Sequence, residues 1–542
     1  MVSWEPRNSL NARGEQFARI VHGRRTQTDS PGYLIHSAET TELMKVHQLL
    51  DHYGVTENPF AQEDAASDQV FREHCLNGTH HAAWDKIYGN PASPATSVVF
   101  GEQGSGKTAL RLQIASKLQE FNRTHPTERA FIVQYEDFNP FLDAFRDRLS
   151  ARQRKPDRAL QNWRLWDHMD SILTLAVTRL ADTIRNDGTD GKDPSHNLTL
   201  DALSKLTRSQ KRDLQLLAAF YDQNRDVSAP HRWASLRRKL KFSTWKAQWD
   251  LGIGIAGTLA TVAITIWLKG SIRALFSWWV LLMALVFWLP FLWRQLKCWW
   301  TAWGVQRQVR VIDHHTGSLR QILTQFQQTE LIGQPFPGRT RGDDRYELLT
   351  RLQSILKTLG FSSIVVLMDR VDEPHLVHGS PERIKDLVWP LFDNKFLKHP
   401  GVAFKLLLPS TVVGYLNRQE KEFYERSRLD KQNMILSLSW TGQGLYDVAN
   451  DRIRACAKLA EKPLSIKDLF DSSISEQELI AVFDRLRAPR HLFKFLYRLF
   501  IEHCSKYTED TPTWQIQRDT LQSTLAVFQR DLEAYDQKLG TG

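Results

Sequence analysis

The stretch "TSVVFGEQGSGKTALRLQIASKL", residues 96–118, decides the fold expected for this chain. An apolar run at 98–100 leads into a glycine-rich loop, and a helical pattern of apolar residues follows. The loop matches G-x-x-x-x-G-K-[ST], in which glycines let backbone N–H groups turn toward phosphate oxygens. The N-terminus of the following helix adds a dipole that favours an anion. The stretch therefore predicts a strand, a phosphate-binding loop and a helix in succession.

The side chains of this loop favour a nucleoside triphosphate bound together with Mg²⁺. Lys107 is placed to reach the β- and γ-phosphates, and the Thr108 hydroxyl is placed to ligate the metal. The residues expected to contact the nucleotide are Gly101, Glu102, Gln103, Gly104, Ser105, Gly106, Lys107 and Thr108.

A second apolar run lies far downstream, in "FSSIVVLMDRVDEPHLV", residues 361–377. Its uninterrupted part, 364–368, predicts a central parallel strand covered on both faces. Asp369 follows directly, at the carboxyl end where such sheets place ligand-facing residues. A carboxylate there can hold Mg²⁺, and a second acid, Asp372 or Glu373, can orient an attacking water. Without the upstream loop, the same stretch would indicate only a buried strand and an acidic turn.

Between the two motifs lie two segments without a charged residue, 251–268 and 274–293. As helices, both are long enough to cross the hydrocarbon core of a bilayer. The link 269–273 allows only a tight hairpin. Because neither segment contains an ionisable residue, the pair predicts an anchor and not an ion pathway. The alternative is a helical hairpin buried inside a soluble domain.

The distribution of charge favours the membrane. The chain of 542 residues has a net charge of +10, yet 232–310 alone carries twelve lysines and arginines and a single acid. Eleven of the eighteen tryptophans also lie there, as expected for side chains at a membrane interface. Basic flanks mark the cytoplasmic side of a span, so the N- and C-terminal parts are expected in the cytoplasm. With the excess charge beside the spans, a nucleic-acid partner is not expected.

These observations predict an α/β protein with the three-layer parallel sheet of a P-loop NTPase. Its expected parts are a polar lead-in (1–55), the first part of the core (56–140), a helical insert with the two spans (141–360), the second part of the core (361–445) and a C-terminal helical lid (446–542).

The order of motifs resembles the KAP family of P-loop NTPases, which are related to the AAA+ and STAND ATPases. The resemblance rests on "GEQGSGKT", on the paired spans and on "IVVLMDRVDE", and covers about 56–500 as an order of elements. It implies that the chain hydrolyses ATP with Mg²⁺ on the cytoplasmic side of the membrane. It also implies that the chain drives or gates a signalling or defence complex, as a homo-oligomer or with a protein partner. The ending Asp369-x-x-Asp372-Glu373 is similar to that of STAND proteins, whose nucleotide-gated switches with little turnover are the alternative.

The resemblance implies four further site residues. Ser410, after the run 402–409, stands where related ATPases have a polar sensor, although an ordinary turn gives the same pattern. Arg426 and Arg428 stand where relatives have an arginine finger, although solvated surface arginines are the simpler interpretation. Arg490 stands where the leading arginine of a lid helix contacts nucleotide. A transporter or channel would need several copies of the two spans to line a pore.

Overall fold

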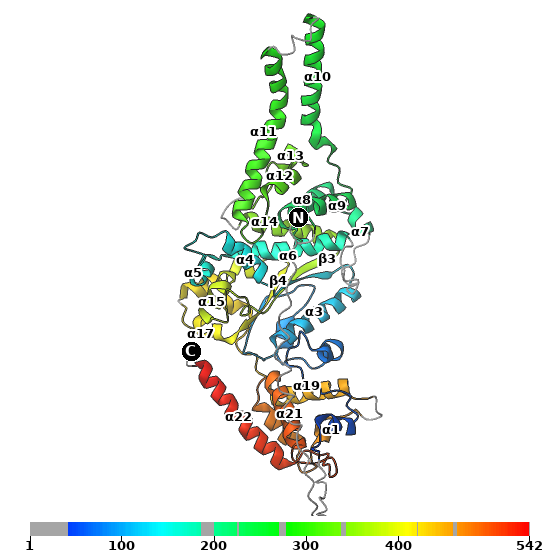
Figure 1. The fold of residues 1–542 in the computed structure, drawn as a ribbon, viewed down its shortest axis with the longest axis vertical. Coiled ribbons are helices and arrows are strands. Elements are labelled where there is room, and N and C mark those ends of the chain that lie inside the picture. Colours follow the sequence, from blue (N-terminus) through cyan, green and yellow to red (C-terminus); the bar gives the residue numbers. More distant parts are fainter. Residues whose placement is uncertain are drawn as a thin grey trace, which may run out of the picture.

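The computed structural model describes residues 42–185, 200–224, 227–269, 278–337, 343–419, 421–458 and 463–540. It shows an α/β protein whose helices surround one five-stranded sheet, and Figure 1 shows the sheet in the middle of an elongated molecule. Most of the expected lead-in (1–41), the link 270–273 and the start of the second span (274–277) lie outside the described residues.

The sheet is entirely parallel, as expected, and its strand order is β2-β3-β4-β1-β5. The strands are β1 (Ser97–Gly101), β2 (Arg129–Tyr135), β3 (Phe361–Met368), β4 (Val402–Pro409) and β5 (Asn433–Ile435). In the register, Gly101 lies opposite Pro409 and Tyr135 lies opposite Met368. The segments that follow β1, β2, β3 and β4 therefore meet along one edge of the sheet.

Side chains alternate between the two faces of the sheet, and helices cover both faces. Val99 packs with Leu110 and Ile114 of α3 (Lys107–Thr124), while Val98 and Phe100 point to the opposite face. That opposite face is covered by α6 (Leu165–Arg185) and α14 (Asp343–Thr358). The strands are buried on both sides, which explains their near-continuous apolar sequences.

Helices fill the segment between β2 and β3, and all of them except α10 share one hydrophobic core with the sheet. They are α4 (Asn139–Asp147), α5 (Pro156–Ala159), α6, α7 (Leu200–Ser204), α8 (Arg208–Tyr221), α9 (Ala229–Lys239), α10 (Trp249–Lys269), α11 (Trp278–Gln308), α12 (Thr316–Leu323), α13 (Gln328–Leu331) and α14. A buried ion pair joins Arg345 of α14 to Asp170 of α6 at 2.8 Å, and the Tyr221 hydroxyl donates to the same carboxylate. Much of the segment 141–360 is thus continuous with the core.

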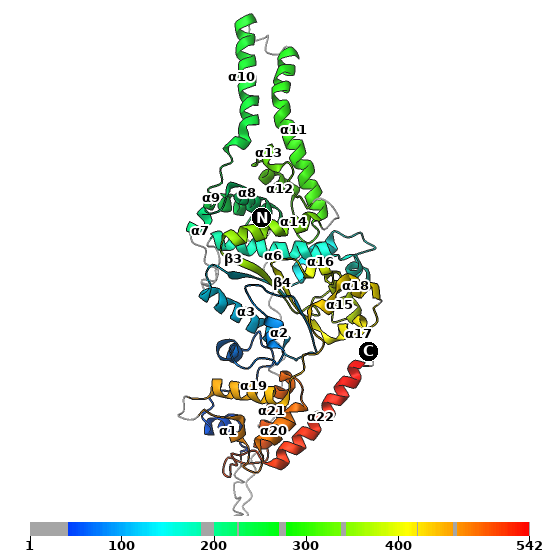
Figure 2. The same cartoon turned by 180° about the vertical axis from the view of Figure 1, so that it is seen from behind.

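Helices α10 and α11 are long and apolar enough to cross a membrane. In the most apolar part of each helix, only 11% (α10) and 6% (α11) of the residues are buried in the protein. This excludes a hairpin buried inside a soluble core. The two helices lie side by side and project from one end of the molecule (Figures 1 and 2). The Trp288 indole N–H donates to the Thr258 hydroxyl at 2.9 Å, which links the two helices.

Helix α11 continues to Gln308, well past Trp293, where the expected span ends. Beyond that point its pattern changes from apolar on all sides to buried on one face. The buried residues of α11 are Arg294, Cys298, Ala302 and Val305. This spacing of three and four keeps them on one stripe, and the same part of the chain packs against α12. The helix therefore passes from the projecting hairpin into the folded body without a break.

A second hydrophobic core lies at the other end of the molecule. It contains α19 (Gly442–Cys456), α20 (Glu476–Asp484), α21 (Pro489–Cys504) and α22 (Arg518–Gly540). Helix α1 (Val46–His52), expected to belong to a polar lead-in, instead buries Leu49 and Leu50 in this core. The remaining helices are α2 (Trp84–Tyr88), α15 (Pro381–Val388), α16 (Asn394–Leu397), α17 (Val413–Leu416) and α18 (Lys421–Ser427).

Candidate functional site

The loop between β1 and α3 has a backbone that requires glycine at two positions. Gly104 and Gly106 have φ of +83° and +93°, in the left-handed region that L side chains rarely adopt. A Cβ at Gly104 would also lie 2.6 Å from the Cβ of Arg490. The Lys107 ammonium donates to the carbonyls of Gly101 and Glu102, both at 2.9 Å. Burial lowers the pKa of Lys107, and the carboxylates of Asp372 and Asp369 oppose that shift.

Thr108 and Asp369, the expected metal ligands, are in direct contact. The Thr108 hydroxyl donates to the Asp369 carboxylate at 2.8 Å, although β4 lies between the strands that precede these residues. Asp369 is buried, and the guanidinium of Arg111 lies 3.5 Å from the same oxygen. Arg111 also pairs with Glu136 at 2.6 Å. Asp369 and Glu136 thus share the buried guanidinium of Arg111.

Asp372 and Glu373 line the same cavity as Lys107 and Thr108. The Glu373 side chain is 59% exposed, so water reaches it. Burial of its inner part raises the pKa of the Glu373 carboxyl, the guanidinium of Arg370 at 3.5 Å opposes the shift, and Asp372 and Asp369 reinforce it.

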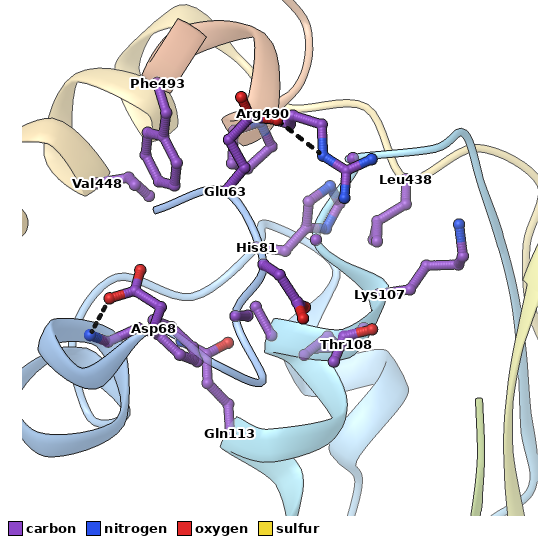
Figure 3. Close-up of a pocket in the computed structure, with 18 of the residues that line it drawn as sticks. Glu63, Asp68, His81, Lys107, Thr108, Gln113, Leu438, Val448, Arg490 and Phe493 are labelled. Atoms are coloured by element: carbon purple, nitrogen blue, oxygen red, sulfur yellow. Dashed lines mark hydrogen bonds and ion pairs between the residues drawn. The ribbon is translucent and has the colours of Figure 1, made fainter. Parts of the chain in front are cut away.

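The cavity has a volume of about 220 Å³ and lies between three parts of the chain. Figure 3 shows Lys107 and Thr108 at the start of α3, with Arg490 and Phe493 above them and Glu63 between. The backbone N–H of Arg490 donates to the Gly104 carbonyl at 3.3 Å, and its guanidinium lies 3.8 Å from Glu63. The Trp440 indole N–H donates to the Ser105 carbonyl at 2.9 Å. The start of α21 and the segment that precedes α19 therefore both contact the loop directly.

A buried ion pair joins the N-terminal segment to the C-terminal helices beside this cavity. Asp68 and Arg452 are 2.6 Å apart and both are buried. The Arg452 guanidinium also lies over the ring of Phe493, 4.5 Å from its centroid. One residue earlier, the Asp451 carboxylate accepts hydrogen bonds from the backbone and hydroxyl of Thr79 at 2.6 and 2.7 Å. We call the Asp68–Arg452 and Thr79–Asp451 contacts the clasp.

Six of the expected residues do not line the cavity in the described part of the chain: Gly101, Glu102 and Ser105 of the loop, and Ser410, Arg426 and Arg428. Ser410 directly follows Pro409, the partner of Gly101 in the register, so it lies at the same edge of the sheet but outside the cavity. Arg426 lies over the ring of Phe423 and lines a separate cavity. Arg428 begins a short turn at positive φ. Arg490 is the one of the four that the fold brings to the loop.

Sequence reasoning missed Arg111, Glu136 and the clasp. Arg111 could have been found, because it follows Thr108 by three residues and so shares its face of the helix. Glu136 follows β2 directly, at the same edge of the sheet as Asp369. The clasp had no local signal, because its partners lie more than 370 positions apart.

The oxygen atoms of Thr108 and Asp369 fit Mg²⁺, a hard cation that proteins bind through one or two carboxylates while substrate phosphates and waters complete its shell. Among the described residues there is no group of three His, Cys, Asp or Glu side chains of the kind that would hold a metal without a substrate. Comparisons of this chain with protein-family models, with curated proteins and with solved structures find no significant match.

Proposed function

We propose that this protein is a membrane-anchored ATPase of the P-loop class, with the KAP-like order of elements described above. The observation that carries the proposal is the Thr108–Asp369 hydrogen bond of 2.8 Å, formed beside the Lys107 loop. A hydroxyl and a carboxylate in contact at the start of a helix are the pair that would hold a Mg²⁺ bound to nucleotide phosphates.

The roles of the chain's own residues follow from their positions. The N–H groups of the 101–108 loop and Lys107 would bind the phosphates, and Arg111 would hold Asp369 in place by charge. Glu373 is the better choice for orienting water, because its pKa is raised and a general base works best when its pKa approaches the working pH. Mg²⁺, when bound, would neutralise charge that develops on the phosphates.

The contacts between the loop and the C-terminal helices favour a second candidate function, a nucleotide-gated switch. Arg490 and Trp440 both reach backbone atoms of the loop, so a nucleotide that reorders the loop would move them too. In a switch, that movement and not turnover would be the output. The bilayer, further copies of the chain and a protein partner remain the proposed partners, with α10 and α11 as anchor and the sheet in the cytoplasm.

The test is ATP turnover by the detergent-solubilised protein, with Lys107→Ala as the blank. We expect Mg²⁺-dependent hydrolysis that falls at least a hundredfold in Lys107→Ala and in Glu373→Gln, as for loss of an electrostatic or acid–base group. Glu373→Gln should still bind ATP, because it keeps the loop, whereas Lys107→Ala should not.

Two outcomes separate the candidates. Tight Mg²⁺-dependent ATP binding without turnover, together with a Glu373→Gln protein that keeps its cellular activity, would favour the switch. Absence of ATP binding by the wild-type protein would refute both.

A further inference from the structure

A cavity of about 300 Å³ lies at the foot of the hairpin, between α11 and the segment that carries α12 and α13. It begins directly after Trp293, the last residue of the charge-free segment. On α11 it is lined by Arg294, Lys297, Cys298 and Thr301, whose spacing places them on one face of the helix. Figure 1 shows α12 and α13 beside the part of α11 where the helix enters the body of the molecule.

The charged side chains of this cavity are both cationic. Arg294 is buried, and its guanidinium is held by the Ala247 carbonyl and by Asp250 at 3.1 Å. Lys297 is exposed and, among the described residues, has no ion-pair partner. No aspartate or glutamate lines the cavity. An anionic ligand would therefore meet an uncompensated ammonium at the opening.

The other walls are apolar or neutral. Leu323, Leu331 and Phe336 line the cavity, and Ile332 beside it leaves 63% of its surface exposed. Leu296 and Trp300 are exposed too, but on the opposite face of α11 from the cavity. The exposed Ile332 side chain thus gives the cavity an apolar border, which a bilayer would cover.

We propose that this cavity binds one anionic phospholipid, with its phosphate at Lys297 and an acyl chain along Ile332. Basic pockets beside spanning helices on the cytoplasmic side bind such headgroups, because they pair the phosphate where hydrocarbon meets water. The inference rests on the proposed membrane anchoring. It adds a specific lipid site to that anchor, on the helix that continues into the core of the protein.

The experiment titrates the full-length, detergent-solubilised protein with short-chain phosphatidylglycerol, short-chain phosphatidylcholine or inorganic phosphate, and follows thermal unfolding. We expect a saturable rise of Tm with phosphatidylglycerol alone. Lys297→Ala should weaken that response about tenfold, as for loss of one charge-assisted hydrogen bond. Ile332→Glu, which places an acid at the opening, should weaken it as well. Both side chains are exposed, so both variants should fold.

Lys239→Ala is the matched control, because Lys239 is an exposed lysine of the same basic flank that does not line the cavity. An equal loss in Lys239→Ala would overturn the site in favour of diffuse charge. Equal responses to both lipids, or to phosphate alone, would overturn it too. Flotation with pure phosphatidylcholine vesicles reports the anchor separately: floating protein without a phosphatidylglycerol effect refutes only the lipid site, and protein that does not float refutes both proposals.

Discussion

At the scale of single residues, the contact between Thr108 and Asp369 joins positions 261 apart in the sequence. Each residue ends or follows a strand, and the parallel sheet brings the carboxyl ends of those strands to one edge. The pairing is therefore a product of topology, and the local sequence supplies only the chemistry. Arg111 adds a buried positive charge within ion-pair distance of both Asp369 and Glu136.

His168 makes the stability of the fold depend on pH. It is fully buried, its Nε2 donates to the Leu387 carbonyl, and its Nδ1 accepts from the Tyr135 hydroxyl. Burial lowers its pKa to about 4, below the value of about 6.5 in an unfolded chain. The unfolded state therefore binds the proton first, so stability present above pH 6.5 is lost as the pH falls toward 4.

When the pH falls from 7 to 5, we expect the free energy of unfolding of His168→Gln to decrease by about 2 kcal/mol less than that of the wild type. The measurement is the shift of Tm between these two pH values. Asp167 has the opposite effect on the pH dependence of stability, because burial raises the pKa of its carboxyl to about 6. Its effect cancels in the comparison, since both proteins contain Asp167. His315→Gln, at an exposed histidine, is the control. An identical Tm shift in wild type and His168→Gln would contradict the prediction.

The sequence predicted those residues of the candidate site that a local pattern specifies. The spacing from Gly101 to Thr108 and the acid after an apolar strand are short-range signals. The fold brings the later part of that loop and Asp369 into one cavity; the loop residues that line it are Gln103, Gly104, Gly106, Lys107 and Thr108. Arg452 and Asp68 have no such signal. An arginine on a helix is usually a solvated surface residue, and the sequence around Arg452 does not indicate that it pairs with Asp68. Burial of such a pair depends on packing between distant segments, which a single sequence does not reveal.

At the scale of elements, the hairpin depends on a glycine contact. A Cβ at Gly257 would lie 2.3 Å from the ring of Phe287 on α11, so α10 and α11 approach closely only because that side chain is absent. We expect Gly257→Ala to destabilise the packing of the two helices by about 1–3 kcal/mol, as for overpacking of a core. The measurement is the thermal stability of the solubilised protein.

Gly252→Ala is the matched control, because nothing lies within 4 Å of a Cβ at that position of the same helix. Alanine should gain about 1 kcal/mol in helix propensity at either position. The difference between the two variants therefore isolates the clash with Phe287. If both variants were equally stable, the close approach of α10 and α11 at Gly257 would make no contribution to the stability of the protein.

The end of α11 shows why element boundaries were harder to predict than element types. Hydropathy alone predicts that the second apolar helix ends at Trp293, because the charged residues Arg294 and Lys297 follow. The helix nevertheless continues to Gln308, since a different face then becomes buried. Arg294 is buried there only because Ala247 and Asp250, from outside the helix, accept its hydrogen bonds and charge. Such compensation is set by tertiary structure.

At the scale of the whole molecule, the clasp joins the N-terminal segment to α19 beside the cavity. Arg452→Met would leave the Asp68 carboxylate buried without its cation, which costs about 3–5 kcal/mol. We expect this variant to unfold at lower denaturant concentration and its C-terminal helices to become sensitive to protease. The measurement is chemical denaturation in detergent, together with limited proteolysis.

The double variant Asp68→Asn with Arg452→Met tests whether the cost comes from the unpaired charge. Removing both charges should recover part of the stability, because no ion then stays buried alone. If the two single changes were simply additive, the residues would not act as a pair.

The strand order also fixes when the protein can fold during its synthesis. Among the described residues, β1 pairs with β4 and β5 alone and β2 pairs with β3 alone, so the two strands made before α10 and α11 are not neighbours. More than two hundred residues, including both apolar helices, leave the ribosome before β3 exists. The sheet thus cannot begin to form until both apolar helices have been synthesised. A chain arranged in this way makes its apolar helices first and completes its sheet afterwards.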